Sequence, residues 1–467
     1  MTRLLALSLL TLLTSCNHGS RPEHAGDVIL ITVDALRPDY LSAELTPTLA
    51  RLAAEGISFT NARANSSHPL QSSAALLTGL LPTRGGSIGL LEAAPSKEAE
   101  TLAEAFALSG FSTSLVSSQP LLSGEGFRRG YADIQIARSG ELWNAEEVAA
   151  RAADVLEDAG DERCFLQLHF ADPHEPHLGD SPPLVSFAEL RARIAGGASG
   201  EALCSEPELN SLKAAYMAEI AAVDAAVSSL LEAIEERANP EGTLLIFTAT
   251  CGEEFLEHGY LGHSWTLNEE AIRVPLFLHA PSFIAPAIDE QAVSLVDLAP
   301  TLFEIVDLRE RQTGFDGEAL IRGGRAAQLG PREILAELII RERCILRAVI
   351  KEDAKLISSS LWRNPSERPA ASASYMKTLR AAAAGELELP PVFGDSSYEV
   401  LYDLKHDALE KTPLSAMSRI SKSQLRAVLN DYREYCSAHG LAPAAAKTAP
   451  SFSDSSEAAA LEALGYL

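Results

Sequence analysis

The chain has 467 residues, of which 46% are hydrophobic, and its 64 acidic and 38 basic side chains give a formal net charge of −26. This length suits one large domain, or a large domain and a small one. The strong negative charge argues against nucleic acid as a partner and against electrostatic steering of polyanionic substrates. The cysteines are widely scattered and, apart from Cys16, odd in number, so they predict no disulfide framework.

The first residues predict export to a bacterial cell envelope. Arg3 precedes an apolar run, Leu4 to Leu13, which is too short to span a bilayer. The run ends in Leu13-Thr14-Ser15-Cys16, which resembles a bacterial lipobox; an ordinary signal peptide with an incidental cysteine is the alternative. The resemblance implies a signal peptide over residues 1–15, a lipidated Cys16 that anchors the protein to a membrane, and a tether over residues 16–26. We therefore expect a lipoprotein that is periplasmic or exposed on the cell surface.

Helices alternate with strand-like apolar segments over much of the chain. The run Asp27 to Val33 is continuously apolar after its first residue and is followed by Asp34, a pattern typical of a central parallel strand. Further strands are predicted at residues 112–116, 164–170 and 243–247, and helices at residues 47–55, 96–109, 145–158 and 209–236. This alternation predicts an α/β fold over residues 27–330, with a central, mostly parallel or mixed sheet sandwiched by helices.

The composition changes after about residue 330. Short strand-like runs at residues 334–340, 345–350 and 355–358 alternate with polar loops, and a helix is predicted at residues 422–437. We expect a smaller C-terminal α+β subdomain over residues 331–440. The Ala/Pro/Ser-rich segment that follows, residues 441–467, is predicted to form a flexible strap and tail.

Short motifs spread along the chain resemble those of the sulfatases, a family of the alkaline phosphatase superfamily. They occur in the family's order at residues 33–39 (VDALRPD), 46–53 (TPTLARLA), 75–79 (ALLTG), 168–176 (LHFADPHEP), 252–255 (GEEF), 269–275 (EEAIRVP), 294–301 (SLVDLAPT), 315–317 (FDG), 401–404 (LYDL) and 464–466 (LGY). The resemblance covers nearly all of the expected mature chain. It implies the α/β fold described above and an ancestry among sulfuric ester hydrolases.

The resemblance also implies a particular chemistry. Sulfatases hold a divalent cation, usually calcium, with hard oxygen donors, and the cation activates a nucleophile derived from Cys or Ser, or a Thr in phosphatase relatives. Basic side chains neutralise the ester oxygens and protonate the leaving group. In this chain Asp34 matches the first metal-binding carboxylate. Arg37, His174 and His263 match groups that would contact the substrate, so they form the expected substrate-binding remnant.

Other positions depart from the family pattern. The family nucleophile lies ten residues before the glycine of the Leu-Leu-Thr-Gly motif, and counting back from Gly79 gives Pro69, which has no nucleophilic group. The second pair of metal ligands aligns with Thr250 and Cys251, a neutral alcohol and a soft thiol that suits calcium poorly. Asp34 therefore remains as a lone metal-site remnant, and a lone carboxylate rarely binds calcium tightly. We expect no catalytic residue at the family position and no cofactor.

The leading hypothesis is a catalytically degenerate pseudoenzyme that binds a small anionic or sugar ligand, or a partner, at the cell envelope. The alternative is an active sulfate or phosphate ester hydrolase that uses calcium and a re-sited serine nucleophile. Ser67, Ser72 and Ser73 are the candidates, because they lie within four residues of Pro69.

A second alternative is a soft-metal site. Zinc prefers cysteine and histidine ligands in tetrahedral geometry, and Cys251 could supply a thiolate beside His174 and His263. The same cysteine would be reactive only if nearby cations or a helix dipole lowered the pKa of its thiol.

Overall fold

The computed structural model describes residues 26–439 apart from residues 90–92, 139–140, 142, 176–181, 196–202, 309–313, 341–343, 362–398 and 415–421. The predicted signal peptide, Cys16, the tether up to residue 25 and the C-terminal strap lie outside the described residues. Within the described part, no helix combines the length and the apolar character needed to cross a bilayer.

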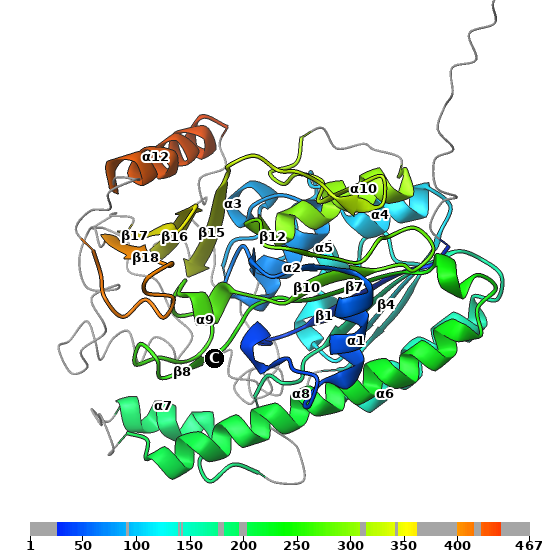
Figure 1. Ribbon diagram of the computed structural model, residues 1–467, viewed down its shortest axis with the longest axis horizontal. Coiled ribbons are helices and arrows are strands. Elements are labelled where there is room, and N and C mark those ends of the chain that lie inside the picture. The colour runs from blue at the N-terminus through cyan, green and yellow to red at the C-terminus, as the bar shows by residue number, and fades with distance from the viewer. Residues whose placement is uncertain are drawn as a thin grey trace, which may run out of the picture.

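An eight-stranded sheet occupies the centre of the molecule (Figure 1), with the strand order β11-β2-β10-β7-β1-β6-β4-β5. The strands are β1 (Val28–Val33), β2 (Ile57–Phe59), β4 (Ser112–Ser117), β5 (Asp133–Ile136), β6 (Cys164–Phe170), β7 (Leu244–Ala249), β10 (Leu276–His279) and β11 (Ala287–Asp289). Strands β7, β1, β6, β4 and β5 run parallel, and β10 is antiparallel to β7 and β2. The predicted α/β fold with a mostly parallel, mixed sheet is confirmed.

Helices cover both faces of this sheet (Figure 1). One face carries α1 (Pro47–Glu55), α6 (Ala145–Asp158) and α8 (Glu206–Glu235), and α8 packs against both of the others. The opposite face carries α2 (Pro69–Thr78), α4 (Leu102–Leu108) and α10 (Leu298–Val306). Strand β1 is fully buried between these layers, which explains its continuously apolar sequence.

Several helices differ from the sequence prediction, and two of them have a clear physical reason. The helix expected over residues 96–109 begins only at Leu102, because Thr101 and Glu104 form a capping box that fixes its first turn. The helix α2 was not predicted. All ten of its residues are buried, so it lacks the amphipathic pattern by which a surface helix is recognised.

A smaller antiparallel sheet follows in the order β15-β16-β17-β18 and is covered by α12 (Lys422–Ala438), which packs on β16 and β17. The strands are β15 (Glu333–Ile340), β16 (Cys344–Lys351), β17 (Ala354–Leu361) and β18 (Glu399–Asp403). The strands and the helix predicted after residue 330 are thus present. The domain boundary at residue 330 itself stays a prediction.

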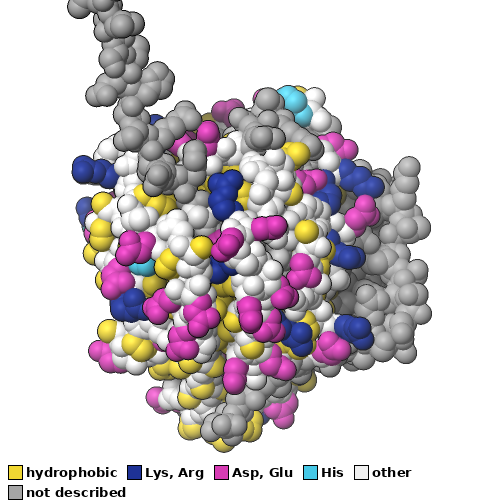
Figure 2. Space-filling model, turned by 90° about the vertical axis from the view of Figure 1, so that its right-hand side faces the viewer, with side chains coloured by type: hydrophobic (Ala, Val, Ile, Leu, Met, Phe, Trp, Pro, Cys, Tyr) yellow, Lys and Arg dark blue, Asp and Glu magenta, His cyan; other side chains and the backbone are white. Residues whose placement is uncertain are grey.

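The surface matches the acidic composition. On the face that Figure 2 shows, acidic side chains are distributed widely, with basic side chains between them. The basic side chains on this face do not gather into a continuous stripe of the kind that would suit a polyanion.

A buried lysine joins the small sheet to the large domain. Lys355 on β17 is fully buried, and its Nζ lies 2.9 Å from Oε1 of Glu269 and 2.9 Å from Oε1 of Glu410. Glu269 begins the short helix α9 (Glu269–Ile272) and also forms an ion pair with Arg63 at 2.8 Å. Burial alone would raise the pKa of Glu269, but Arg63 and Lys355 hold it well below its usual range.

We predict that Lys355→Met destabilises the protein by about 3–5 kcal/mol, because the substitution leaves two buried carboxylates without their shared cation. The matched control is Lys351→Met, which lies beside the same β16–β17 turn at the end of the neighbouring strand β16. Lys351 pairs with Glu333, and both side chains are about one third exposed, so solvent screens this pair and its loss should cost far less than the loss of Lys355. Denaturant unfolding of both variants measures the difference; equal losses would contradict a structural role for the Lys355 ion pairs.

Candidate functional site

Adjacent parallel strands bring their carboxyl ends together at one edge of the central sheet. Asp34 directly follows β1, Thr250 directly follows β7, and the strand register pairs Val33 with Ala249. Gln119 follows β4, whose last residue pairs with His169 of β6. In open α/β sheets this edge is where ligands bind. The fold therefore assembles the site that the motifs predicted.

The carboxylate of Asp34 is completely buried, and side chains contact both of its oxygens. The Thr250 hydroxyl donates to Oδ1 at 2.5 Å, and Nε2 of Gln119 donates to Oδ2 at 3.1 Å. Nε2 of His169 lies 3.2 Å from Oδ2. Sequence reasoning missed Gln119 and His169. Both residues lie at or near the carboxyl end of a buried strand, and His169 also lies within the 168–176 motif; these signals become meaningful once the strand order is known.

These contacts favour the charged form of Asp34. Burial by itself raises the pKa of this carboxyl, but the positive potential of His169 and His174 and the Thr250 hydrogen bond lower it by more. The pKa of Asp34 therefore lies well below its usual range. The side chains around Asp34 stabilise a negative charge without a metal ion.

The residues at this edge do not fit the calcium ion of the sulfatase chemistry. Calcium takes six to eight oxygen ligands, usually including several carboxylates. Here Asp34 is one carboxylate whose two oxygens already contact other side chains, and Thr250 and Cys251 follow β7 where the further metal ligands were expected. No catalytic step through a calcium ion follows from this arrangement.

The position expected for the nucleophile lies at the start of α2. Pro69 is the first residue of this helix, His68 is its N-cap, and Gly79 ends it in the left-handed conformation with φ of 66°. His68 lies close enough to Asp34, His174 and His263 for their charges to affect its protonation. The structure therefore places the Pro69 segment beside the strand-end site, although Pro69 itself carries no reactive group.

The serine candidates near Pro69 are buried. Ser67 is inaccessible to solvent, as is Ser72, and Ser73 is 3% exposed. The hydroxyls of Ser67 and Ser72 have no hydrogen-bond partner among the described residues. A nucleophilic serine needs a base within hydrogen-bonding reach, and the structure provides none for these two hydroxyls in the part of the chain that it describes.

Cys251 lies at the same edge but in an environment that suppresses thiolate formation. Its side chain is fully buried, and burial, followed by the negative charges of Asp34 and Glu253, raises the pKa of the thiol well above its ordinary value. A reactive cysteine requires the opposite shift. Among the described residues, Cys251 does not belong to any cluster of three potential metal ligands.

His174 and His263 lie against each other. Their ring centroids are 4.7 Å apart in an edge-to-face arrangement, and Nδ1 of His263 is 3.3 Å from Oε2 of Glu253. The side chain of His263 is 8% exposed. The structure thus brings together the two histidines that the sequence assigned to the substrate-binding remnant, close to the strand-end site.

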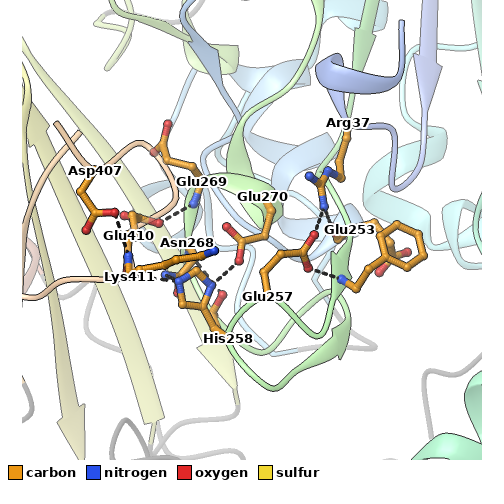
Figure 3. Close-up of polar contacts among 12 residues, drawn as sticks. Arg37, Glu253, Glu257, His258, Asn268, Glu269, Glu270, Asp407, Glu410 and Lys411 are labelled. Carbon is orange, nitrogen blue, oxygen red and sulfur yellow. Dashed lines mark hydrogen bonds and ion pairs between the residues drawn. The ribbon is translucent and has the colours of Figure 1, made fainter. Parts of the chain in front are cut away.

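Arg37, the third residue of that remnant, is engaged in ion pairs (Figure 3). Its guanidinium contacts Oε1 of Glu257 at 2.6 Å. It also contacts both carboxylate oxygens of Asp39, at 2.9 Å and 2.7 Å. It also donates to the backbone carbonyl of Glu253 at 3.1 Å. Burial alone would lower the pKa of Arg37, but these carboxylates raise it above its usual value. In this structure Arg37 stabilises the loop after β7.

Comparison with known proteins agrees with this geometry. The sulfatase family model matches residues 27–308, more than half of the chain. The chain belongs to the sulfatase family. It is 28% identical over 343 residues to arylsulfatase A of Homo sapiens, and this match covers 59% of this chain and 63% of that protein. It is 23% identical over 351 residues to an arylsulfatase of Hemicentrotus pulcherrimus, and this match covers 64% of this chain and 61% of that protein. The matches thus span less than two thirds of the length of these two relatives.

Solved structures agree with this fold. One similar protein, determined with its substrate D-glucosamine-2-N,6-O-disulfate, has a TM-score of 0.67 and 17% identity, and the match covers 88% of this chain and 98% of that one. At this identity the likeness establishes the sulfatase fold alone. The family and the fold are shown, whereas activity is a separate question.

We predict that His68 makes the protein sensitive to acid. Burial, followed by repulsion from His263, lowers the pKa of His68 to about 3 from an ordinary value of 6.5. The unfolded state therefore binds more protons than the folded state between these values. Stability present above pH 6.5 is lost as the pH falls toward 3, by up to about 1.4 kcal/mol per pH unit.

Chemical unfolding between pH 6.5 and 4.5 tests this effect, because the contribution of Asp34 is lost only at lower pH. His68→Gln should flatten the pH dependence of the free energy of unfolding. His439→Gln, which replaces an exposed histidine, should leave it unchanged. An unaltered slope in His68→Gln would contradict the prediction.

Proposed function

We propose that this sulfatase-family protein binds a small anionic or sugar ligand at the bacterial cell envelope without hydrolysing it. The observation that carries the proposal is the set of contacts around Asp34. Thr250 and Gln119 hydrogen-bond the carboxylate that would otherwise bind a metal ion, and His169 lies at ion-pair distance. A cation would have to displace these contacts, and among the described residues Asp34 does not belong to any group of three potential metal ligands.

The absence of a usable nucleophile supports the same proposal. Pro69 occupies the family position, and within the described chain Ser67 and Ser72 lack a hydrogen-bonded base. Cys251 is held in its neutral form by burial and by nearby negative charge. The re-sited serine hydrolase is therefore the weaker candidate. The hydrolase would also require calcium, and the side chains around Asp34 do not suit that ion.

His174 and His263 are the residues that we assign to ligand contact. Two imidazoles in contact can donate hydrogen bonds to an anionic group and attract its charge when protonated. The structural relative bound to a disulfated glucosamine gives a precedent for a sulfated sugar in this fold. The net charge of −26 disfavours long polyanions, so a small ligand suits this protein better.

We predict no turnover of an aryl sulfate above the buffer rate, with or without calcium, and calorimetrically measurable binding of sulfated monosaccharides. His174→Ala and His263→Ala should each weaken binding by about tenfold or more, because a lost hydrogen bond to a charged group costs about 1.5–3 kcal/mol. His439→Ala is the control, since this exposed histidine lies directly after α12.

Two outcomes would contradict the proposal. Hydrolysis abolished by a single alanine substitution at Ser67, Ser72 or Ser73 would establish the re-sited hydrolase. Binding that is unchanged in both histidine variants would remove the assigned ligand contacts.

We also propose that the protein is anchored through lipidated Cys16. In a bacterial host, the full-length protein should fractionate with membranes and incorporate a radiolabelled fatty acid, whereas Cys16→Ala should lose the label and be recovered in the soluble fraction. The matched control is Cys436→Ala, which should keep the membrane fractionation. A Cys16→Ala protein that still carries the label would contradict the anchor.

A further inference from the structure

A second group of potential metal ligands lies beside the strand-end site. One ligand atom from each of Glu254, His258 and Glu270 lies within 4.8 Å of the other two. Glu254 begins β8 (Glu254–Phe255), His258 lies in the turn between β8 and β9 (Leu261–Gly262), and Glu270 lies in α9. None of these three side chains belongs to the remnant catalytic positions described above.

Glu254 requires compensation for its charge. The residue is 0% exposed, and neither of its carboxylate oxygens has a hydrogen-bond partner among the described residues. An unpaired buried carboxylate is costly, so the site needs either a proton or a cation.

His258 is oriented as a metal-binding histidine would be (Figure 3). Its Nδ1 faces the carboxylate of Glu270, which it contacts directly. On the opposite side of the ring, Nε2 lies 3.3 Å from the backbone carbonyl of Glu410 and 3.3 Å from Nδ2 of Asn268. Metal-binding histidines usually donate the other ring N–H to a carbonyl or carboxylate in this way. The ring is therefore positioned to present Nδ1 to an ion between Glu254 and Glu270.

The balance of charge around Glu254 and Glu270 favours a divalent cation. Two nearby cations are already paired with other carboxylates: Arg37 with Asp39 and Glu257, and Lys355 with Glu269 and Glu410. Glu254 and Glu270 are paired with neither of these cations. A dipositive ion would balance two carboxylates that the protein itself brings together.

We propose that Glu254, His258 and Glu270 bind one zinc ion. A set of one imidazole and two carboxylates matches the nitrogen and oxygen ligands that zinc accepts, with a water in the fourth position. Calcium is less suited, because it takes only oxygen ligands and more of them. The side chain of His258 is 17% exposed, which gives the ion a route from solvent. The zinc ion would link the β8–β9 turn to α9 through its ligands.

The test uses the exported protein without its lipid anchor. Elemental analysis should find about one zinc per chain, and after removal by a chelator, zinc alone should restore both the metal content and the melting temperature. Glu254→Gln should weaken zinc binding by at least about 100-fold, since loss of even an indirect ligand contact costs 10–100-fold. Cys251→Ser and Glu257→Gln are matched controls from the same segment and should retain the zinc.

Cobalt substitution of the unmodified protein gives a second measurement that does not depend on how the variants fold. The cobalt form should show the visible absorption of a four-coordinate site with nitrogen and oxygen ligands. A thiolate-to-cobalt charge-transfer band would overturn the proposal in favour of Cys251. Full zinc retention in Glu254→Gln, or a metal-free protein whose melting temperature zinc does not change, would also overturn it.

Discussion

The burial of one carboxylate, Asp34, at the end of the central strand β1 governs the arrangement of the site. A charged group with no access to solvent must be compensated by hydrogen bonds or by an opposite charge. In a sulfatase that hydrolyses esters, the resemblance implies a metal ion for this purpose. Here Thr250 from β7 and Gln119 from the loop after β4 contact the carboxylate, and His169 adds positive potential. The parallel register of β7, β1, β6 and β4 makes these contacts possible, because it aligns the strand ends at one edge.

A second constraint is the concentration of buried acidic residues after β7. Arg37 offsets Glu257, and Lys355 offsets Glu269 and Glu410, so ion pairs link the edge of the large sheet to the small one. These pairs contribute to specificity as much as to stability, because each cation must approach its carboxylates from a different element. They also explain why Arg37 contacts its neighbours in the structure and is not directed toward a ligand.

The sequence predicted the architecture well, because buried parallel strands such as β1 and β6 are continuous apolar runs and amphipathic helices such as α6 have a clear period. It could not predict α2, whose burial on all sides removes that period. The motifs singled out Asp34 and Thr250, which the structure brings together, whereas Gln119 lies outside every motif and His169, although inside the 168–176 motif, was given no role. Their proximity to Asp34 depends on which strands become neighbours, and that is a tertiary property.

The residues at the predicted family positions fit the fold locally. Proline at the first position of a helix is favoured, because its missing N–H would have no partner inside the helix and its φ is already suitable, so Pro69 suits the start of α2. Thr250 gives Asp34 a hydrogen bond in the place of a metal contact. At both positions the residue present satisfies the backbone or the buried charge. The negative charge of Asp34 is therefore compensated by neighbouring side chains, and these contacts would have to break before the carboxylate could bind a cation.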